Sequence, residues 1–294
     1  MTEFEAARPS SSEPKVPDTV DALLVPLDGS DFSRLAVPTA ARLAARLEAE
    51  IHLLSAVDSA DEVVPREREL DRVEIPGHVV NRSVVVDSDP ASAVQAALHR
   101  LGNAVACMAT HGRTRSTALV GSVATDVVAR GHDPLVLVCP YMEQPRRSSG
   151  VVACVDDSPA SAALVAVAVR WAELLAERCI VLTVAEDAPE PVSGGAIRCR
   201  FGPDGDAEGY LAALVAPFIT AGHAVEAVVR YEPVNVWGGL YRYLLDHPAA
   251  LVAINTRSRT GLHRLVFGSV AATIARHSPS PVLVVPRNQA GPPS

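Results

Sequence analysis

Two loops of this chain combine glycine, hydroxyl and cationic side chains in a similar order, each between an apolar strand-like run and an amphipathic stretch. The first is Met108-Ala-Thr-His-Gly-Arg-Thr-Arg-Ser-Thr-Ala-Leu-Val-Gly-Ser122, and the second is Ile254-Asn-Thr-Arg-Ser-Arg-Thr-Gly-Leu-His-Arg-Leu-Val-Phe-Gly-Ser269. Both close with Gly-Ser at the expected start of a helix, whose first turn has backbone N–H groups without partners in the helix. Because such N–H groups bind phosphate, each loop predicts a phosphate-binding site.

Cationic side chains are concentrated in these two loops, although the chain as a whole is acidic. They are Arg113, Arg115, Arg257, Arg259, His263 and Arg264, against a formal net charge of −8. Positive charge at a phosphate-binding loop favours an anionic ligand. Solvated loop residues would carry the same charges without binding anything, so the composition of the loops leaves both interpretations open.

The motifs of other chemistries do not occur. The sequence contains no GxxxxGK[ST] phosphate loop, no GxGxxG after the first expected strand, no HExxH and no Cys/His pairs at zinc spacing. Ser122 and Ser269 do not lie in GxSxG, so capping of a helix or contact with phosphate is expected of them rather than nucleophilic attack. The five cysteines show no CxxC spacing and are expected to be reduced and buried. We therefore expect no catalytic residue, no resident metal site and no enzymatic activity.

Short Val-rich runs alternate with helical stretches along the whole chain. We expect strands at 22–27, 51–57, 78–86, 104–108 and 135–139, and again at 151–155, 180–185, 224–231, 251–254 and 282–285. This alternation predicts doubly wound α/β domains, each with a five-stranded parallel sheet flanked by helices. Asp28 and Asp156 each follow the first strand of a half, where open α/β sheets bind ligands. Capping of the next helix is an alternative role for both, and the two roles are compatible.

The repeat divides the chain into two domains. We expect an N-terminal disordered tail at 1–20, a first domain at 21–141, a linker at 142–149, a second domain at 150–287 and a C-terminal tail at 288–294. An aromatic segment, Trp237-Gly-Gly-Leu-Tyr-Arg-Tyr243, lies on one expected helix of the second domain. Packing in the core is the interpretation we favour for it, with an interface or a cover for a pocket as alternatives.

Composition restricts the partners. With 26 Lys and Arg against 34 Asp and Glu, the chain is not expected to bind nucleic acid. The first 20 residues are rich in Pro, Ser and Glu and are not expected to be a secretory signal. No apolar run is long enough to cross a bilayer, so we expect a cytoplasmic protein with no membrane partner.

The residues just described resemble the universal stress protein family in its tandem two-domain form. The resemblance is carried by Leu24-Val-Pro-Leu-Asp-Gly-Ser, Asp89-Pro-Ala-Ser-Ala-Val, Val155-Asp-Asp-Ser, the two Gly-Ser-Val-Ala runs and Pro281-Val-Leu-Val-Val. It implies flavodoxin-like (adenine nucleotide alpha hydrolase-like) domains, a further homodimer and binding of ATP, with Mg²⁺ as a companion to the phosphates. By position it implies that the ligand contacts Asp28, Val57, Gly112, Arg113, Gly121 and Ser122 in the first domain, and Asp156, Val184, Gly268 and Ser269 in the second.

Neither loop keeps the family's Gly-x2-Gly-x9-Gly-[Ser/Thr] motif whole. In the first loop the leading glycine is Ala109, and the interval from Gly112 to Gly121 is one residue short. In the second loop the interval is complete, but the first two glycines are Asn255 and Ser258. A β-carbon matters at these places only if the backbone needs positive φ or a phosphate approaches closely. We therefore expect nucleotide binding in a stress-response or regulatory role, with a preference for the first domain.

Two alternatives accompany this expectation. In the first, the chain acts through protein contacts and both pockets are vestigial, since each loop has lost part of the motif. A slow ATPase is the other alternative, for which no general base or phosphate-loop lysine is found.

Overall fold

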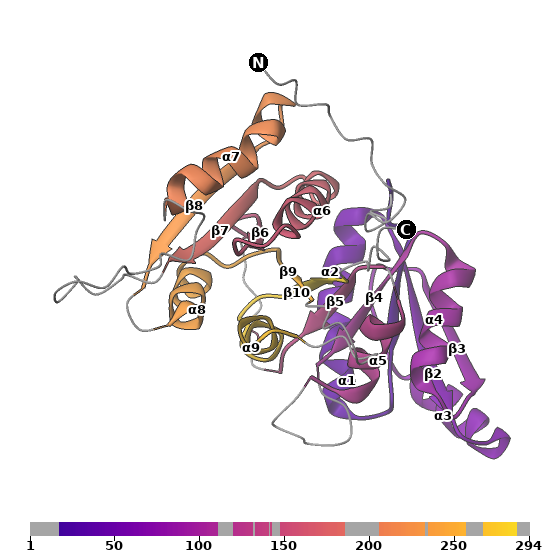
Figure 1. The fold of residues 1–294 in the computed structure, drawn as a ribbon. Helices are drawn as coiled ribbons and strands as arrows, with labels where there is room; N and C mark the ends of the chain where they lie inside the picture. The colour runs from indigo at the N-terminus through magenta and orange to yellow at the C-terminus, as the bar shows by residue number, and fades with distance from the viewer. Residues whose placement is uncertain are drawn as a thin grey trace, which may run out of the picture.

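A single ten-stranded sheet runs through the protein, with helices on both of its faces (Figure 1). The computed structural model describes residues 18–110, 120–131, 133–140, 142, 148–185, 206–232, 235–256 and 267–286. Within these residues, the strands of the first half and those of the second half are contiguous blocks of the sheet. The predicted doubly wound α/β fold is thus confirmed in both halves.

The first half follows the predicted alternation closely. Its strands are β1 (Ala22–Pro26), β2 (Glu50–Val57), β3 (Val80–Val86), β4 (Ala104–Ala109) and β5 (Leu135–Val138). Its helices are α1 (Asp31–Arg34), α2 (Ala36–Leu47), the 3-10 helix η1 (Ala60–Glu62), α3 (Val63–Asp71), α4 (Pro90–Leu101) and α5 (Ser122–Arg130).

The second half repeats this plan with the same kinds of element in the same order. Its strands are β6 (Val151–Cys154), β7 (Cys179–Ala185), β8 (Val225–Tyr231), β9 (Leu251–Asn255) and β10 (Val282–Val285). Its helices are α6 (Ser161–Leu174), α7 (Ala207–Thr220), α8 (Val236–Asp246) and α9 (Ser269–His277).

Both faces of the sheet are covered, which explains the continuous apolar strands. Along β1, Leu23 and Val25 belong to one buried cluster and Leu24 to another, because successive side chains point to opposite faces. Helices α2, α3, α6 and α7 cover one face, and α4, α5, α8 and α9 cover the other (Figure 1). Each cluster contains residues of both halves, so the two halves share their hydrophobic core.

The order of strands places a reversal in each half. The sheet runs β3-β2-β1-β4-β5-β10-β9-β6-β7-β8, so each half has the order third, second, first, fourth, fifth. All pairs within a half are parallel. The strand order reverses between β1 and β4, and again between β6 and β9, and ligands of open α/β sheets bind at such reversals.

The two halves meet through β5 and β10, the only antiparallel pair among the described strands. Val282 lies opposite Leu137, Leu283 opposite Val136, and Val284 opposite Leu135. The register is symmetric about Val136 and Leu283, which relates the two halves by a pseudo-twofold axis. On one face Arg46 of α2 also bonds to Glu177 at 2.8 Å, beyond the end of α6.

Three features differ from the sequence-based expectation. The helical stretch after the first strand, expected from the sequence to be one helix over residues 33–50, is split into α1 and α2 and ends at Glu48, which adopts a left-handed conformation with φ of 55°. Val20, assigned to the disordered tail, is instead 3% exposed and packs in the core. A single apolar residue at the end of a polar segment is too weak a sequence signal to place. The rest of that tail, residues 1–17, and the C-terminal tail at 288–294 lie outside the described residues.

Two observations on the described residues concern the membrane partner and the homodimer considered in the sequence analysis. None of the described helices is long and apolar enough to cross a bilayer. Because β5 and β10 pair with each other inside one chain, a homodimer could not use these strand edges. The homodimer, the cytoplasmic location and the boundaries of the linker stay predictions.

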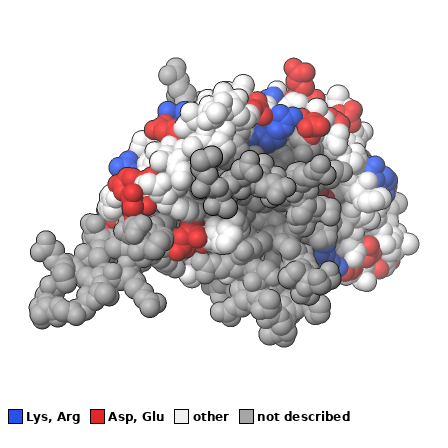
Figure 2. Space-filling model, turned by 45° about the horizontal axis from the view of Figure 1, so that its top comes forward, with Lys and Arg blue, Asp and Glu red and all other residues white. Residues whose placement is uncertain are grey.

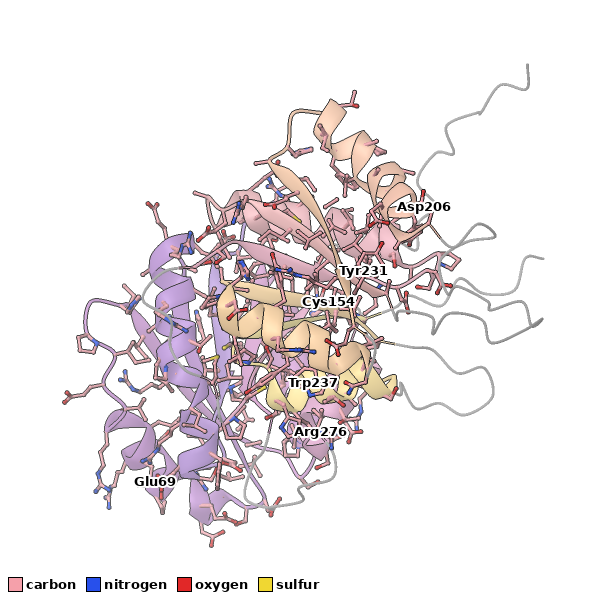
Figure 3. The ribbon with its side chains drawn as sticks, turned by 90° about the vertical axis from the view of Figure 1, so that its left-hand side faces the viewer. Glu69, Cys154, Asp206, Tyr231, Trp237 and Arg276 are labelled. Carbon is pink, nitrogen blue, oxygen red and sulfur yellow. The ribbon has the colours of Figure 1, made fainter. Side chains whose placement is uncertain are left out.

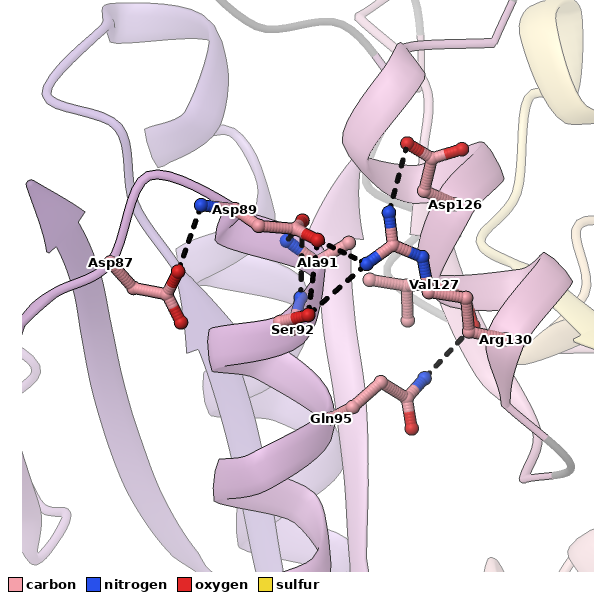
Figure 4. A network of polar contacts seen from close by, with 8 residues as sticks. All are labelled: Asp87, Asp89, Ala91, Ser92, Gln95, Asp126, Val127 and Arg130. Carbon is pink, nitrogen blue, oxygen red and sulfur yellow. Dashed lines mark hydrogen bonds and ion pairs between the residues drawn. The ribbon is translucent and has the colours of Figure 1, made fainter. Parts of the chain in front are cut away.

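A network of polar contacts holds the start of α4 against α5 (Figure 4). Asp89 caps α4 by accepting from the N–H groups of Ala91 and Ser92 at 3.1 and 3.3 Å, and it forms an ion pair with Arg130. Arg130 also donates to the Ser92 hydroxyl at 3.1 Å and lies 3.7 Å from Asp126. The hydrogen bond from Arg130 lowers the pKa of Asp89 from 3.8 to about 2, and those from Ser92 act in the same direction.

Replacing the largest fully buried side chain among the described residues tests whether the two halves share one core. Trp171 of α6 is 0% exposed, and its indole N–H is buried without a hydrogen-bond partner among the described residues. Trp171→Ala should lower the free energy of unfolding by about 3–5 kcal/mol, measured by urea denaturation followed by circular dichroism. Trp171→Phe, which also removes the unpartnered N–H, should cost less. Two separate transitions, of which the variant moves only one, would contradict a core shared between the halves.

The polar network around Asp89 predicts that the stability of the folded protein falls in acid. Since the pKa of Asp89 is lower in the folded state than its ordinary value, its stabilising effect is present above pH 3.8 and is lost as the pH falls through about 2. Carboxyl NMR titration should therefore find Asp89 titrating near 2, and near its ordinary value in Arg130→Gln. Asp89→Asn keeps a good cap and should remove this part of the acid dependence from thermal unfolding curves. Titration of the wild-type carboxyl near 3.8 would contradict the network.

Candidate functional site

Each half has a cavity at the carboxyl ends of its parallel strands, at the reversal of strand order. The larger, of about 640 Å³, is lined by residues that end β6 and β9 and by the starts of α8 and α9. The smaller, of about 280 Å³, is lined by residues that end β1 and β4 and by the starts of α4 and α5. The two halves thus place cavities of different size at equivalent positions.

The larger cavity brings together all four residues predicted for the second domain. Asp156, Val184, Gly268 and Ser269 come from four separate segments of the chain, and each lines its wall. They meet because the carboxyl ends of β6 and β7 and the start of α9 share one edge of the parallel sheet.

The smaller cavity brings together three of the six residues predicted for the first domain. Asp28, Gly121 and Ser122 line it. Gly112 and Arg113 lie outside the described residues, as do the other cationic residues of both loops. Val57 does not line this cavity, although the sequence analysis placed it there.

The position expected for Val57 is held by its neighbour Ala56. The hydroxyls of Ser55 and Thr183 each donate to the backbone carbonyl that follows the adjacent strand, at 2.7 and 3.0 Å, so these two residues are equivalent. The next residues, Ala56 and Val184, line the two cavities. A shift of one residue along a strand turns the side chain to the opposite face, which is why Val57 is excluded. Equal spacing from the two aspartate-containing turns, 28 to 56 and 156 to 184, would have given the correct residue.

The two aspartates organise the turns after the first strand of each half. Asp28 accepts from the backbone N–H and hydroxyl of Ser30 at 2.9 and 2.6 Å, and Ser30 in turn caps α1. Asp156 accepts from the backbone N–H of Ser158 at 3.1 Å. The turn-forming role is therefore present in both halves. It leaves the aspartates at the cavity walls, where a carboxylate can also accept from the hydroxyl groups of a ligand.

Both helices that follow the loops begin without a side-chain cap. Gly121 and Gly268 are the N-cap residues, with extended backbones (φ −50° and −60°), and neither supplies an oxygen to the first turn. In contrast, α1, α4, α7 and α8 all have a side chain that accepts from the first turn. The first residues of α5 and α9 line the cavities, so their N–H groups are suited to an anion.

Loss of the leading glycine causes no backbone strain in either half. Ala109 and Asn255 end β4 and β9, and neither is among the described non-glycine residues with positive φ. The side chain of Asn255 donates to the carbonyl of Ala160 at 2.9 Å, which engages its amide at the wall of the cavity. The sequence alone could not supply φ, on which the effect of these substitutions depends.

The start of α8 has an uncharged cap and a large aromatic side chain, unlike the start of α4. Asn235 caps α8 by accepting from Gly238 at 2.7 Å, as Asp89 caps α4, but it carries no charge. Two residues later Trp237 stands where α4 has Ala91. Trp237 is half-buried, lines the larger cavity and lies on the side of α8 that faces α9 (Figure 3).

The aromatic segment thus divides between two roles. Tyr243 is 6% exposed and packs in the core, as the sequence analysis favoured for the whole segment. Trp237 packs against the same core and also lines the larger cavity, which agrees with one of the alternatives as well. Helical periodicity separates these residues, because they face different sides of α8.

The described lining of the larger cavity contains two charged side chains, Asp156 and Asp157, both acidic. Positive potential from the described residues therefore comes from the backbone at the start of α9. On the face shown in Figure 2, cationic and anionic side chains are interspersed among the described residues rather than gathered into patches of one sign.

The described residues contain neither a cluster of metal ligands nor a cysteine whose pKa is lowered. Among them, no group of three His, Cys, Asp or Glu side chains is arranged to hold a metal ion. Burial raises the pKa of Cys107, Cys139, Cys154 and Cys179 to about 12, so these thiols are protonated at neutral pH. All four are free of disulfides.

The second half of the chain matches a known protein family. Residues 149–286 match the model of the universal stress protein family. The comparison with curated proteins found no match for this chain.

Solved structures share the fold of the whole chain. A universal stress protein from Archaeoglobus fulgidus DSM 4304 is 16% identical, with 93% of this chain and 99% of that chain covered and a TM-score of 0.66. A protein assigned as a universal stress protein from Pseudomonas aeruginosa UCBPP-PA14 is 17% identical, with 92% and 94% covered and a TM-score of 0.62. At these identities the likeness shows the fold alone.

A universal stress protein solved in complex with cAMP also matches, over 41% of this chain and 97% of that chain, at 23% identity. Its TM-score of 0.35 is too low to support an inference about ligands here. The family match, the cavities at both strand reversals and the repeated strand order agree with one another. Residues 149–286 thus match the universal stress protein family, and the first half repeats the strand order of the second half in the same sheet.

Proposed function

We propose that this protein binds an adenine nucleotide, ATP, in the larger cavity, in a stress-response or regulatory role. One observation carries the proposal: Asp156, Val184, Gly268 and Ser269, which the family resemblance marks as ligand contacts, all line that cavity. An apolar wall, a carboxylate and the open start of a helix are what a base, a ribose and a phosphate respectively require.

The sizes of the two cavities support the second domain over the first. Sites for small molecules typically measure about 300–1,000 Å³. The cavity of the second half, at about 640 Å³, falls well inside this range, and that of the first half, at about 280 Å³, falls just below it. The proposal therefore reverses the preference for the first domain that the glycine count suggested.

Phosphate would be held by the first turn of α9. Gly268 leaves the N–H groups there uncapped, and they line the cavity. Mg²⁺ commonly binds through one or two carboxylates together with the phosphates of its nucleotide. Asp156 and Asp157 supply two carboxylates on the wall of the same cavity, so we propose that the nucleotide binds together with Mg²⁺.

We also propose that the protein is a binding module rather than an enzyme. The described walls of the larger cavity contain no histidine, lysine or glutamate that could activate water, and the two aspartates are placed to bind the ligand. Incubation with ATP and Mg²⁺ should therefore release no ADP beyond the rate seen in buffer. Steady ADP release that scales with protein concentration, followed by chromatography, would contradict this part of the proposal.

Calorimetric titration of the nucleotide-stripped protein with ATP and Mg²⁺ tests the site. Gly268→Asp places a carboxylate at the N-cap, where it accepts from the first turn of α9 and repels phosphate. The backbone of Gly268 is compatible with any residue, so the fold should persist. Loss of hydrogen bonds to a charged group should raise the Kd by at least about tenfold.

Two variants serve as controls for Gly268→Asp. Gly268→Ala leaves the N–H groups open and should bind ATP nearly as the wild type does. Gly121→Asp makes the same change in the first half and should also retain binding. Loss of binding in Gly121→Asp alone would assign the site to the first half. Absence of heat and of thermal stabilisation at millimolar ATP would overturn the proposal and favour a module that acts through protein contacts.

A further inference from the structure

The wall of the larger cavity includes one aromatic side chain. Trp237 is the second residue of α8, is half-buried and lines the cavity wall. Its ring lies 5.1 Å from that of Tyr241 and 6.3 Å from that of His277, measured between centroids. Aromatic neighbours on two helices thus fix the position of the indole at the wall.

The equivalent wall of the first half lacks this ring. Asp89 and Asn235 are the caps of α4 and α8, and two residues after them the chain has Ala91 and Trp237 respectively. The arginine that anchors the start of α4 is replaced by His277 at the end of α9, which contacts the indole instead. Where the first half has an ion pair between α4 and α5, the second half therefore has a cluster of aromatic rings beside the larger cavity.

The start of α8 is also tied to the apolar end of the cavity. Gly239 packs so closely on β7 that a β-carbon there would lie 2.9 Å from Cγ1 of Val184. Val184 and Trp237 both line the cavity, so they provide apolar surface around the first turn of α8. This part of the wall suits a flat, apolar group.

The anion-binding part of the cavity lies at a distance from the indole contact. Gly268 precedes α9 and His277 ends it, and nine residues of helix span about 13 Å at 1.5 Å per residue. An extended nucleotide can bridge from the first turn of α9 to the ring cluster, whereas a free phosphate or a free base would occupy one end only.

We propose that Trp237 stacks on the base of the bound nucleotide and gives the site a preference for purines. The inference rests on the proposed function, since it assigns the base-binding residue of the same cavity. Base-to-aromatic stacking is tolerant of sequence but grows with the area of the rings, so a purine should bind more tightly than a pyrimidine. Trp237 would be a specificity-determining residue rather than a phosphate ligand.

Calorimetry with ATP, CTP and inorganic tripolyphosphate, each with Mg²⁺, tests the assignment. Trp237→Ala should raise the Kd for ATP by about tenfold, as expected for loss of one stacked base. The Kd for tripolyphosphate should not change, and that for CTP should change less than that for ATP. Trp237→Phe retains an aromatic face and should recover most of the affinity for ATP.

Fluorescence gives a second readout, because the chain has two tryptophans and Trp171 is fully buried away from the cavity. ATP should quench the emission of the wild type, and the quenching should disappear in Trp237→Phe. Tripolyphosphate should not quench. These signals would not follow from a merely structural role of Trp237.

The outcomes separate the two proposals. If the wild type binds ATP and Gly268→Asp does not, but Trp237→Ala binds ATP as tightly as the wild type, the stacking assignment is wrong and the proposed function stands. An equal loss of ATP and tripolyphosphate in Trp237→Ala would likewise overturn stacking, because it would show general damage to the cavity. Failure of the wild type to bind ATP would overturn both proposals.

Discussion

The antiparallel pairing of β5 with β10 is the interaction on which the arrangement of this molecule depends. It pairs one edge strand of each half with that of the other and so joins two five-stranded sheets into one. Because the register is symmetric about Val136 and Leu283, the two carboxyl edges and their cavities are related by a pseudo-twofold axis. The helices on either face then bury side chains of both halves together, so that the halves are not independent in their cores.

Within this symmetric frame the described walls of the two cavities carry different side chains. Both have an aspartate after the first strand and an uncapped helix after the loop. They differ where the helix after the third strand begins: a charged network around Arg130 in one half, and the rings of Trp237 and His277 in the other. A frame that fixes the backbone leaves the side chains at these positions free to differ between the two halves.

Most of the fold could be predicted because the buried strands are short, apolar and regularly spaced. The residues after β1 and β6 and those before α5 and α9 were also identified from their types. Prediction failed where a single residue decided the outcome. Val57 and Ala56 are both apolar and adjacent, and the pairing of β2 with β1 shows which one faces the cavity. Val20 is one apolar residue in a polar segment, and its burial depends on neighbours far away in the sequence.

The sequence by itself determined the class of fold, its duplication and the residues that reach the carboxyl edge, since hydrophobic periodicity and loop composition are local properties. Only the tertiary structure decided that the halves form one sheet, that Ala109 and Asn255 have unstrained backbones, and that the larger cavity lies in the second half. It also showed that Trp237, which packs against the core, lines the wall of that cavity. Volume, backbone dihedrals and the exposure of a helical face all depend on how separate segments pack, and one-dimensional patterns do not contain that information.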